Sequence, residues 1–202
     1  WPGFRSNLDG ELDRLEGIYR RLLQNSGVET FDMRAMVDAP HAVRLADGRV
    51  VTAKVILLAT GGWPSVPDVP GAEYAITSNE IFHLQALPKR ILIVGGGYIA
   101  CEFAGILNGL GVQTHLWYRG EAVLRGFDTE ARDVIVQGMQ ERGVQMQMRT
   151  NVTRIEKQGS GYSVTDTQGA RHDFDVVMYA TGRKPKSTGL GLEAQGIGLD
   201  DA

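Results

Sequence analysis

The glycines at positions 95 to 97 carry the strongest chemical signal in the sequence. They follow the apolar run 91–94 and form the pattern Gly-x-Gly-x-x-Ala, which continues into a helical pattern. Gly95 permits a tight turn, Gly97 lets the backbone approach a pyrophosphate, and the helix N-terminus offers unsatisfied N–H groups to it. Glycine clusters also mark ordinary turns. Because a strand is expected before this glycine cluster and a helix after it, the sequence favours dinucleotide binding over a purely structural turn.

Two arginines predict which dinucleotide would bind. NAD-binding turns of this type place an acidic residue at the end of the second strand, where it accepts the ribose 2′-hydroxyl. Here that position falls on Tyr118-Arg119, and Arg125 follows six residues after Arg119. Two guanidiniums suit a 2′-phosphate, so the sequence favours NADPH over NADH. Glu121 lies between the arginines and would weaken this preference, and either arginine could instead be a solvated loop charge.

The elements that must position these residues form a β-α-β-α-β pattern followed by a meander and a closing strand. Apolar periodicity, the cap residue Asp128 and the stop residues Gly111 and Gly143 set the expected boundaries. The expected strands are 90–94, 112–118, 144–148, 152–157, 162–166 and 174–180, and the expected helices are 97–110 and 128–142. Thr77 and Glu80 have the spacing of a capping box, which predicts a further short helix to about Leu84.

Two Ala-Thr-Gly sequences, at 59–61 and 180–182, flank this pattern and indicate the domain organisation. We interpret them as the points where the chain leaves one nucleotide domain and returns to it. Residues 63–184 are therefore predicted to form an inserted domain, and 1–62 and 185–202 to be pieces of the surrounding one. Before the insertion we expect an amphipathic helix and short strands, at 8–23, 28–37, 42–45 and 50–59.

Composition excludes several other classes of function. The 21 Lys and Arg against 24 Asp and Glu give a net charge of −3 without a basic block, which argues against nucleic-acid binding. The apolar runs are too short to cross a membrane. Cys101 is the single cysteine, so the chain has neither a dithiol nor a cysteine-rich zinc site, and the four histidines lack ligand spacing, so no metal is expected. A reducing, cytoplasmic compartment is expected.

With these motifs in place, the sequence resembles the flavin-dependent pyridine nucleotide-disulfide oxidoreductases, and within them the glutathione reductase branch. The resemblance implies an α/β fold: a Rossmann-like NADPH-binding domain, with a parallel sheet plus a β-meander, inserted between pieces of an incomplete FAD-binding domain. The stretches that carry it are 14–23, 59–62, 75–78, 95–105, 118–128 and 180–183.

The resemblance also implies a two-electron relay from NADPH to FAD, to a redox disulfide and then to glutathione disulfide. It implies that Tyr98 is the aromatic lid over the flavin, that Glu102 lies near it, and that Tyr19 wedges against the disulfide substrate. The implied contacts are, for NADPH, Gly95, Gly97, Tyr98, Ile99, Ala100, Arg119, Arg125 and Gly182, and for FAD, Thr60, Gly61, Ser78 and Arg183.

Each implied role has a plainer alternative. Tyr98 could be a surface aromatic, Glu102 a solvated helix charge, and Tyr19 part of the apolar stripe of its own helix. Cys101 and Trp117 are expected to serve packing.

Several family motifs are missing from these 202 residues: the FAD glycine fingerprint, the paired redox cysteines, the FAD-closing Gly-Asp segment and the interface domain with its histidine. We therefore expect no catalysis by this chain alone, and expect it to act with the remainder of a parent chain, which by family resemblance is a homodimer. A relative such as dihydrolipoamide dehydrogenase or mercuric reductase, or a non-catalytic NADPH-binding module, remains an alternative.

Overall fold

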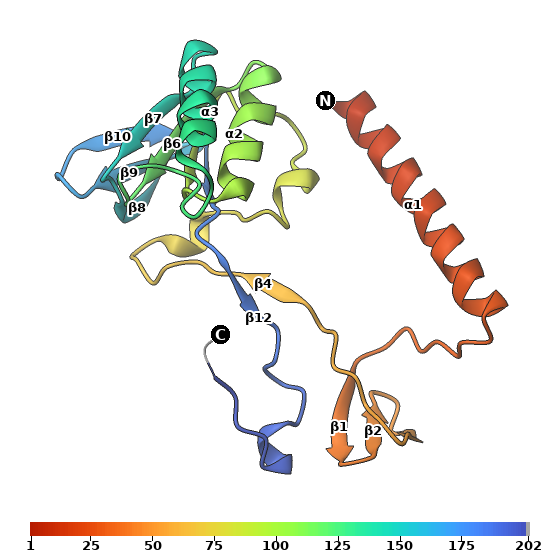
Figure 1. Cartoon of the computed structure of the whole chain (residues 1–202). Coiled ribbons are helices and arrows are strands. Elements are labelled where there is room, and N and C mark those ends of the chain that lie inside the picture. Colours follow the sequence, from red (N-terminus) through yellow and green to blue (C-terminus); the bar gives the residue numbers. More distant parts are fainter. Residues whose placement is uncertain (201–202) are drawn as a thin grey trace. The chain divides into compact units, whose positions relative to one another are not determined.

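The computed structural model describes residues 1–200, which divide into two compact units (Figure 1). We call Pro64–Arg183, together with Trp1, the central unit. We call Pro2–Trp63, together with the chain from Lys184 onward, the flanking unit. The chain passes between them along strands β4 (Gly62–Pro64) and β12 (Arg183–Pro185), which pair as a two-stranded sheet.

The central unit is built on a four-stranded parallel sheet in the order β11-β5-β6-β7. Helix α2 connects β5 to β6 and α3 connects β6 to β7, so the unit contains two consecutive β-α-β crossovers. This confirms the parallel sheet of the predicted α/β fold. The elements are β5 (Arg90–Val94), α2 (Tyr98–Gly109), β6 (Gln113–Tyr118), α3 (Thr129–Glu141), β7 (Gln145–Met148) and β11 (Val176–Tyr179).

An antiparallel sheet in the order β10-β9-β8 covers the second face of the parallel sheet, opposite the helices (Figure 1). Its strands are β8 (Val152–Gln158), β9 (Gly161–Asp166) and β10 (Arg171–Phe174). The strand expected at 174–180 is thus two strands, because Phe174 ends β10 and Val176 begins β11. The two strands belong to different sheets.

Alternation along β5 explains the three layers. Ile91 and Ile93 pack with the helices, in one apolar cluster, while Leu92 and Val94 pack with the antiparallel sheet in the other. All four side chains are buried, as expected for a parallel strand covered on both faces. The carboxyl ends of β5, β6 and β11 are therefore held between two packed cores.

Cap residues end the helices close to the predicted positions. Gly97 is the N-cap of α2, and Gly111, with φ +85°, follows its end. The side chain of Asp128 accepts a hydrogen bond from the N–H of Ala131 at 3.0 Å, so it caps α3 as predicted. Gly143, with φ +97°, follows the end of α3.

The segment from 65 to 89 contains only short turns. It forms two 3₁₀ helices, η1 (Ala72–Tyr74) and η2 (Ile81–His83), and Ile76 bridges in parallel to Met178 of β11. The Glu80 carboxylate accepts from the N–H and the hydroxyl of Thr77, so the predicted capping contact forms. The contact closes the turn at 77–80, and the 3₁₀ helix η2 begins after it, at Ile81, in place of the helix expected from Thr77.

The flanking unit has the expected helix and strands, of which β2 has its expected limits and the others differ, and it adds a 3₁₀ helix. They are α1 (Pro2–Asn25), β1 (Ala35–Ala39), β2 (Ala42–Leu45), β3 (Val50–Thr52) and η3 (Glu193–Gln195). The three strands form one antiparallel sheet, and Gly48, with φ +89°, lies in the turn between β2 and β3.

The expectation of a strand that continues to residue 59 is wrong for this structure. Strand β3 ends at Thr52, and Val55 and Leu57 beyond it are more than four-fifths exposed. Within residues 1–200, no strand pairs with the stretch 55–59. An apolar run without a neighbouring strand cannot complete its backbone hydrogen bonds as a sheet does.

Candidate nucleotide-binding cleft

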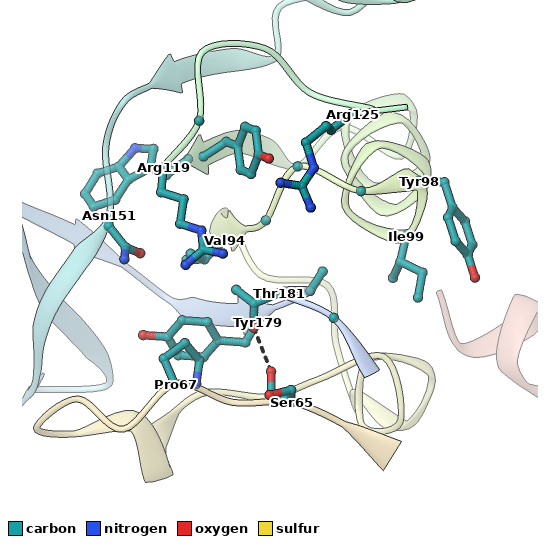
Figure 2. A pocket seen from close by; sticks show the side chains of 18 of the residues that line it. Ser65, Pro67, Val94, Tyr98, Ile99, Arg119, Arg125, Asn151, Tyr179 and Thr181 are labelled. Atoms are coloured by element: carbon teal, nitrogen blue, oxygen red, sulfur yellow. Dashed lines mark hydrogen bonds between the residues drawn. The ribbon is translucent and has the colours of Figure 1, made fainter. Parts of the chain in front are cut away.

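A cleft of about 1140 Å³ opens at the carboxyl ends of the parallel strands in the central unit (Figure 2). Its walls come from the ends of β5, β6 and β11, from the loops that follow them, and from the segment after Pro64. In open α/β sheets, ligands bind at this edge, where the crossovers run to opposite sides. The topology therefore places the cleft where a nucleotide would be expected.

Gly95 is required because the end of β11 passes close to the end of β5. Its φ is +150°, and a Cβ at this position would collide with the carbonyl group of Ala180. Two hydrogen bonds fix the turn, from the Gly95 N–H to the Trp117 carbonyl at 2.9 Å and from the Ala180 N–H to the Val94 carbonyl at 2.8 Å. The three strand ends are thereby tied together at the base of the cleft.

Gly97 presents an open surface at the start of α2. A Cβ here would have no atom within 4 Å, and no side chain caps the helix. The first turn of α2 also carries no acidic residue. Its free N–H groups and positive dipole end can therefore receive a phosphate that approaches the backbone closely.

Tyr118, at the end of β6, packs its ring against two glycines of the cleft wall. A Cβ on Gly96 would lie 2.5 Å from the ring carbons, and a Cβ on Gly120 would lie 2.5 Å from the far edge of the ring. The N–H of Leu124 also donates to the Gly96 carbonyl at 2.6 Å. The loop after β6 is therefore held against the glycine turn by both a ring and a hydrogen bond.

Arg119 and Arg125 point into the cleft from the loop after β6, with Tyr179 and Thr181 on the opposite wall (Figure 2). Neither guanidinium forms an ion pair within residues 1–200. Glu121, expected to weaken the anion site, instead pairs with Arg149 at 2.7 Å. The positive charge of the two arginines is thus left for a ligand.

Most of the residues predicted to bind NADPH or FAD meet at this cleft. Among the predicted residues of the central unit, Ala100 and Glu102 do not line it: Ala100 is buried in the first turn of α2, and Glu102 is exposed on the same helix. Tyr98 is 56% exposed at the rim, so its side chain is accessible from solvent. The predicted residues that line the cleft are Gly95, Gly97, Tyr98, Ile99, Arg119, Arg125, Gly182, Ser78 and Arg183.

The other predicted residues belong to the flanking unit. Thr60 donates its hydroxyl to the Lys186 carbonyl at 2.9 Å, and Gly61, with φ +69°, follows it. Tyr19 is 65% exposed on α1. In the central unit Thr181 likewise donates to a backbone carbonyl, that of Ser65, at 2.6 Å (Figure 2). The threonine of each Ala-Thr-Gly sequence therefore hydrogen-bonds to the backbone of a segment that is distant in the sequence.

Trp117 and Tyr179 line the cleft although the sequence indicated only packing for Trp117 and no role for Tyr179. Both side chains are buried, and the indole N–H of Trp117 and the hydroxyl of Tyr179 have no hydrogen-bond partner within residues 1–200. Burial raises the pKa of Tyr179 to about 12, so its hydroxyl stays protonated. The only sequence signal was their place near the carboxyl ends of apolar strands: Tyr179 is the last residue of β11, and Trp117 is the last but one of β6.

Cys101 and the histidines supply no chemistry at the cleft. Burial, with a smaller contribution from Glu102, raises the pKa of the Cys101 thiol to about 11, so it is inert at neutral pH. Across residues 1–200, no group of three His, Cys, Asp or Glu side chains is placed to hold a metal ion. The same stretch contains no helix with the length and apolarity needed to span a membrane.

This fold and this cleft define a Rossmann-type nucleotide-binding protein. The model of the pyridine nucleotide-disulphide oxidoreductase family matches residues 2–202. The chain belongs to this family, which confirms the resemblance found in the sequence. The expected cofactors, a pyridine nucleotide and FAD, are those of the family.

Curated relatives carry the comparison further. A glutathione reductase from Burkholderia cepacia is 45% identical over 200 residues, which is 99% of this chain and 44% of the relative. One from Nostoc is 41% identical over 100% of this chain and 44% of the relative. The chain therefore spans less than half the length of the curated relatives it matches.

Solved structures agree on the fold. LpdA from Mycobacterium tuberculosis matches with a TM-score of 0.86 and 26% identity, over 98% of this chain and 46% of that one. The HOCl-induced flavoprotein disulfide reductase RclA from Escherichia coli matches with a TM-score of 0.80 and 25% identity, over 86% of this chain and 40% of that one.

Proposed function

We propose that the central unit binds NADPH and that this chain is the NADPH-binding part of a flavin-dependent glutathione-disulfide reductase. The observation that carries the proposal is the pair Arg119 and Arg125, which face the cleft without an ion-pair partner in residues 1–200. A 2′-phosphate offers charged acceptors that match two guanidiniums. NADH has only a hydroxyl at this place.

In this proposal different parts of the cleft bind different groups of NADPH. The pyrophosphate lies at the open backbone of Gly97 and the N-terminus of α2, and the adenosine 2′-phosphate lies between Arg119 and Arg125. Tyr98, exposed at the rim, would then cover the nicotinamide end. When bound, NADPH supplies a hydride that FAD accepts.

The FAD side of the proposal rests on family membership and on fewer residues. Ser78 and Arg183 line the cleft in the central unit, whereas Thr60 and Gly61 belong to the flanking unit. The described residues contain one glycine turn of the dinucleotide type, the one used here for NADPH. FAD binding is therefore proposed for the complete protein.

A calorimetric titration of the 202-residue chain with NADPH and with NADH tests the nucleotide assignment. We expect NADPH to bind about ten to a hundred times more tightly, because each charged hydrogen bond to the 2′-phosphate contributes about 1.5–3 kcal/mol before solvent screening. Arg119→Ala with Arg125→Ala should remove the difference. Arg171→Ala on β10, which changes the net charge at a distance, serves as the control.

Equal binding of both nucleotides by the unaltered chain would show that the 2′-phosphate assignment is wrong. If neither nucleotide bound while circular dichroism showed the folded helices and strands, the cleft itself would be misassigned.

We propose further that the complete protein is a cytoplasmic homodimer that converts NADPH, a proton and glutathione disulfide into NADP⁺ and two glutathiones. Support comes from glutathione reductases that are 41% and 45% identical to this chain. Within this proposal Tyr19 contacts the disulfide substrate. The test follows NADPH oxidation by the complete protein with glutathione disulfide or with oxidised lipoamide; a faster reaction with lipoamide would contradict it.

A further inference from the structure

Arg132 lines the same cleft, although nothing in the sequence distinguished it from other helix charges. It lies in the first turn of α3 and is half-buried. Its Nε–H donates to the carbonyl of Val123 at 2.8 Å, and Val123 lies in the loop between Arg119 and Arg125. One edge of the Arg132 guanidinium therefore holds the loop that carries the other two arginines.

The terminal N–H groups of Arg132 take no part in the hydrogen bond to Val123. Within residues 1–200 the guanidinium has no other hydrogen bond and no ion pair. A planar guanidinium can use its Nε edge for one acceptor and its terminal nitrogens for a second one. Arg132 can thus hold the loop and contact a ligand at the same time.

The charge balance at this end of the cleft favours an anion with more than one charge. Arg119, Arg125 and Arg132 bring three positive charges to the lining, and the acidic residue beside them, Glu121, is paired with Arg149. Clustered like charges repel one another unless a counter-charge binds. A phosphate monoester carries close to two negative charges and three acceptor oxygens, which match three guanidiniums.

We propose that Arg132 is a third guanidinium of the 2′-phosphate site, donating its terminal N–H groups to the phosphate while its Nε–H holds the loop. This inference rests on the proposed binding of NADPH and deepens it. It makes Arg132 a specificity-determining residue, because NADH has no group that these N–H groups could bind.

The test uses two small probes that differ in the 2′-phosphate: adenosine 2′,5′-bisphosphate and adenosine 5′-monophosphate. Each is titrated calorimetrically into the 202-residue chain and into Arg132→Gln. We expect the variant to bind the bisphosphate about ten-fold more weakly and the monophosphate within two-fold of the unaltered chain. Arg142→Gln, at the far end of the same helix, removes the same charge outside this cleft and should change neither affinity.

A second comparison separates direct contact from an effect through the loop. In a background with both Arg119→Gln and Arg125→Gln, Arg132→Gln should still weaken bisphosphate binding several-fold. No further loss in that background would mean that Arg132 acts only through the loop that carries the other two arginines, which would overturn the proposal. An equal loss for both probes, or no loss, would overturn it too.

Folding and the underlying assignment are checked separately. Should Arg132→Gln unfold, as judged by circular dichroism, Arg132→Lys keeps the charge and should weaken only bisphosphate binding, by about three-fold; an unchanged affinity would count against the proposal. If the unaltered chain bound both probes equally, the NADPH assignment itself would fail. If it preferred the bisphosphate and Arg132→Gln retained that preference, only the role of Arg132 would fail.

Discussion

The central and flanking units differ in how their apolar residues are used. In the central unit both faces of the parallel sheet are covered, and most of its apolar side chains lie in two buried clusters. Among the described residues of the flanking unit, Val37, Leu45 and Leu192 are the only buried hydrophobic ones, and none of the 24 residues of α1 is buried. The same kinds of apolar pattern thus give a core in one unit and an exposed surface in the other.

The comparison shows that periodicity predicts an element but not its partner. Leu12 and Leu22 have helical spacing on α1 yet are more than half exposed. Local ion pairs, such as Arg20 with Glu16 at 2.7 Å, support this helix instead. Exposed pairs of this kind contribute little to stability. We therefore expect the two units to differ strongly in local stability.

The largest expected effect comes from truncating one apolar side chain in each unit. Ile93 is fully buried in β5, so Ile93→Ala should lower the free energy of unfolding by about 4 kcal/mol through lost burial and a cavity. Leu57 is 86% exposed, and Leu57→Ala should change the free energy of unfolding by less than about 0.5 kcal/mol. Urea denaturation followed by the fluorescence of the buried Trp117 measures the first effect, and far-ultraviolet circular dichroism follows both units. Similar losses from both changes would mean that the stretch after β3 is packed in solution.

A pH titration should sharpen the difference in stability between the two units, because the central unit buries a histidine, His115. Burial lowers the pKa of His115 to about 4, with smaller contributions from Arg90 and His172. Arg90 donates its Nε–H to His115 Nε2 at 3.1 Å, which requires the neutral ring. Between pH 6.5 and 4 the unfolded chain therefore binds a proton that the folded chain does not.

The free energy of unfolding should consequently fall as the pH is lowered through this window, by roughly 2–3 kcal/mol from His115. Urea titrations at pH 7, 6, 5 and 4 should show a smaller decrease for His115→Gln, which keeps an acceptor for Arg90. His41→Gln, at an exposed position of the flanking unit, should follow the unaltered protein. Parallel curves for all three would exclude His115 as the source.

Much of the central unit could be predicted because several local signals agree there. Strand β5 was predicted with its exact limits, and α2 and β6 within one residue, since apolar period, glycine turn and cap residues all indicate the same boundaries. The division into β10 and β11 was missed, because the two strands are separated by Asp175 alone and belong to different sheets. A local pattern carries no information on which sheet a strand joins.

The residues of the cleft show the same limit of prediction from local sequence patterns. Its glycine turn and two of its arginines lie in one continuous segment, so their spacing was visible in the sequence. Arg132 and Tyr179 reach the cleft from α3 and β11, and only the packed fold brings them to it. Trp117 lies within the continuous segment, but its place in an apolar strand indicated packing alone. The prediction of a strand at 55–59 was wrong for a related reason. The apolar residues indicated a strand, but the sequence did not show that no neighbouring strand pairs with it within residues 1–200.

A smaller effect is expected from the packing of Tyr118 against the glycine turn. Gly96→Ala would place a Cβ 2.5 Å from the Tyr118 ring, so it should cost about 2 kcal/mol of unfolding free energy. In a Tyr118→Val background the ring is gone, and the same change should cost much less. The four urea denaturation curves of this double-mutant cycle give the coupling between the two residues. Additive losses would show that the ring does not restrict position 96. Gly10→Ala on α1, where a Cβ would meet no atom within 4 Å, gives the matching measurement in the flanking unit.

The smallest predicted effect compares how the two units hold a helix. The Asp128 carboxylate caps α3, so Asp128→Ala should lower the free energy of unfolding by about 1 kcal/mol, while Asp128→Asn keeps an acceptor for the Ala131 N–H and should restore most of it. On α1, Glu16→Ala removes an exposed ion pair with Arg20 and should leave the urea midpoint unchanged. A cap matters in α3 because its helix also packs on a core through Met139, so losing the cap loosens a packed element. If Glu16→Ala shifted the midpoint as much as Asp128→Ala, the stability of α1 would depend on more than its own side chains, and the contrast between the units would be smaller than the burial of their residues indicates.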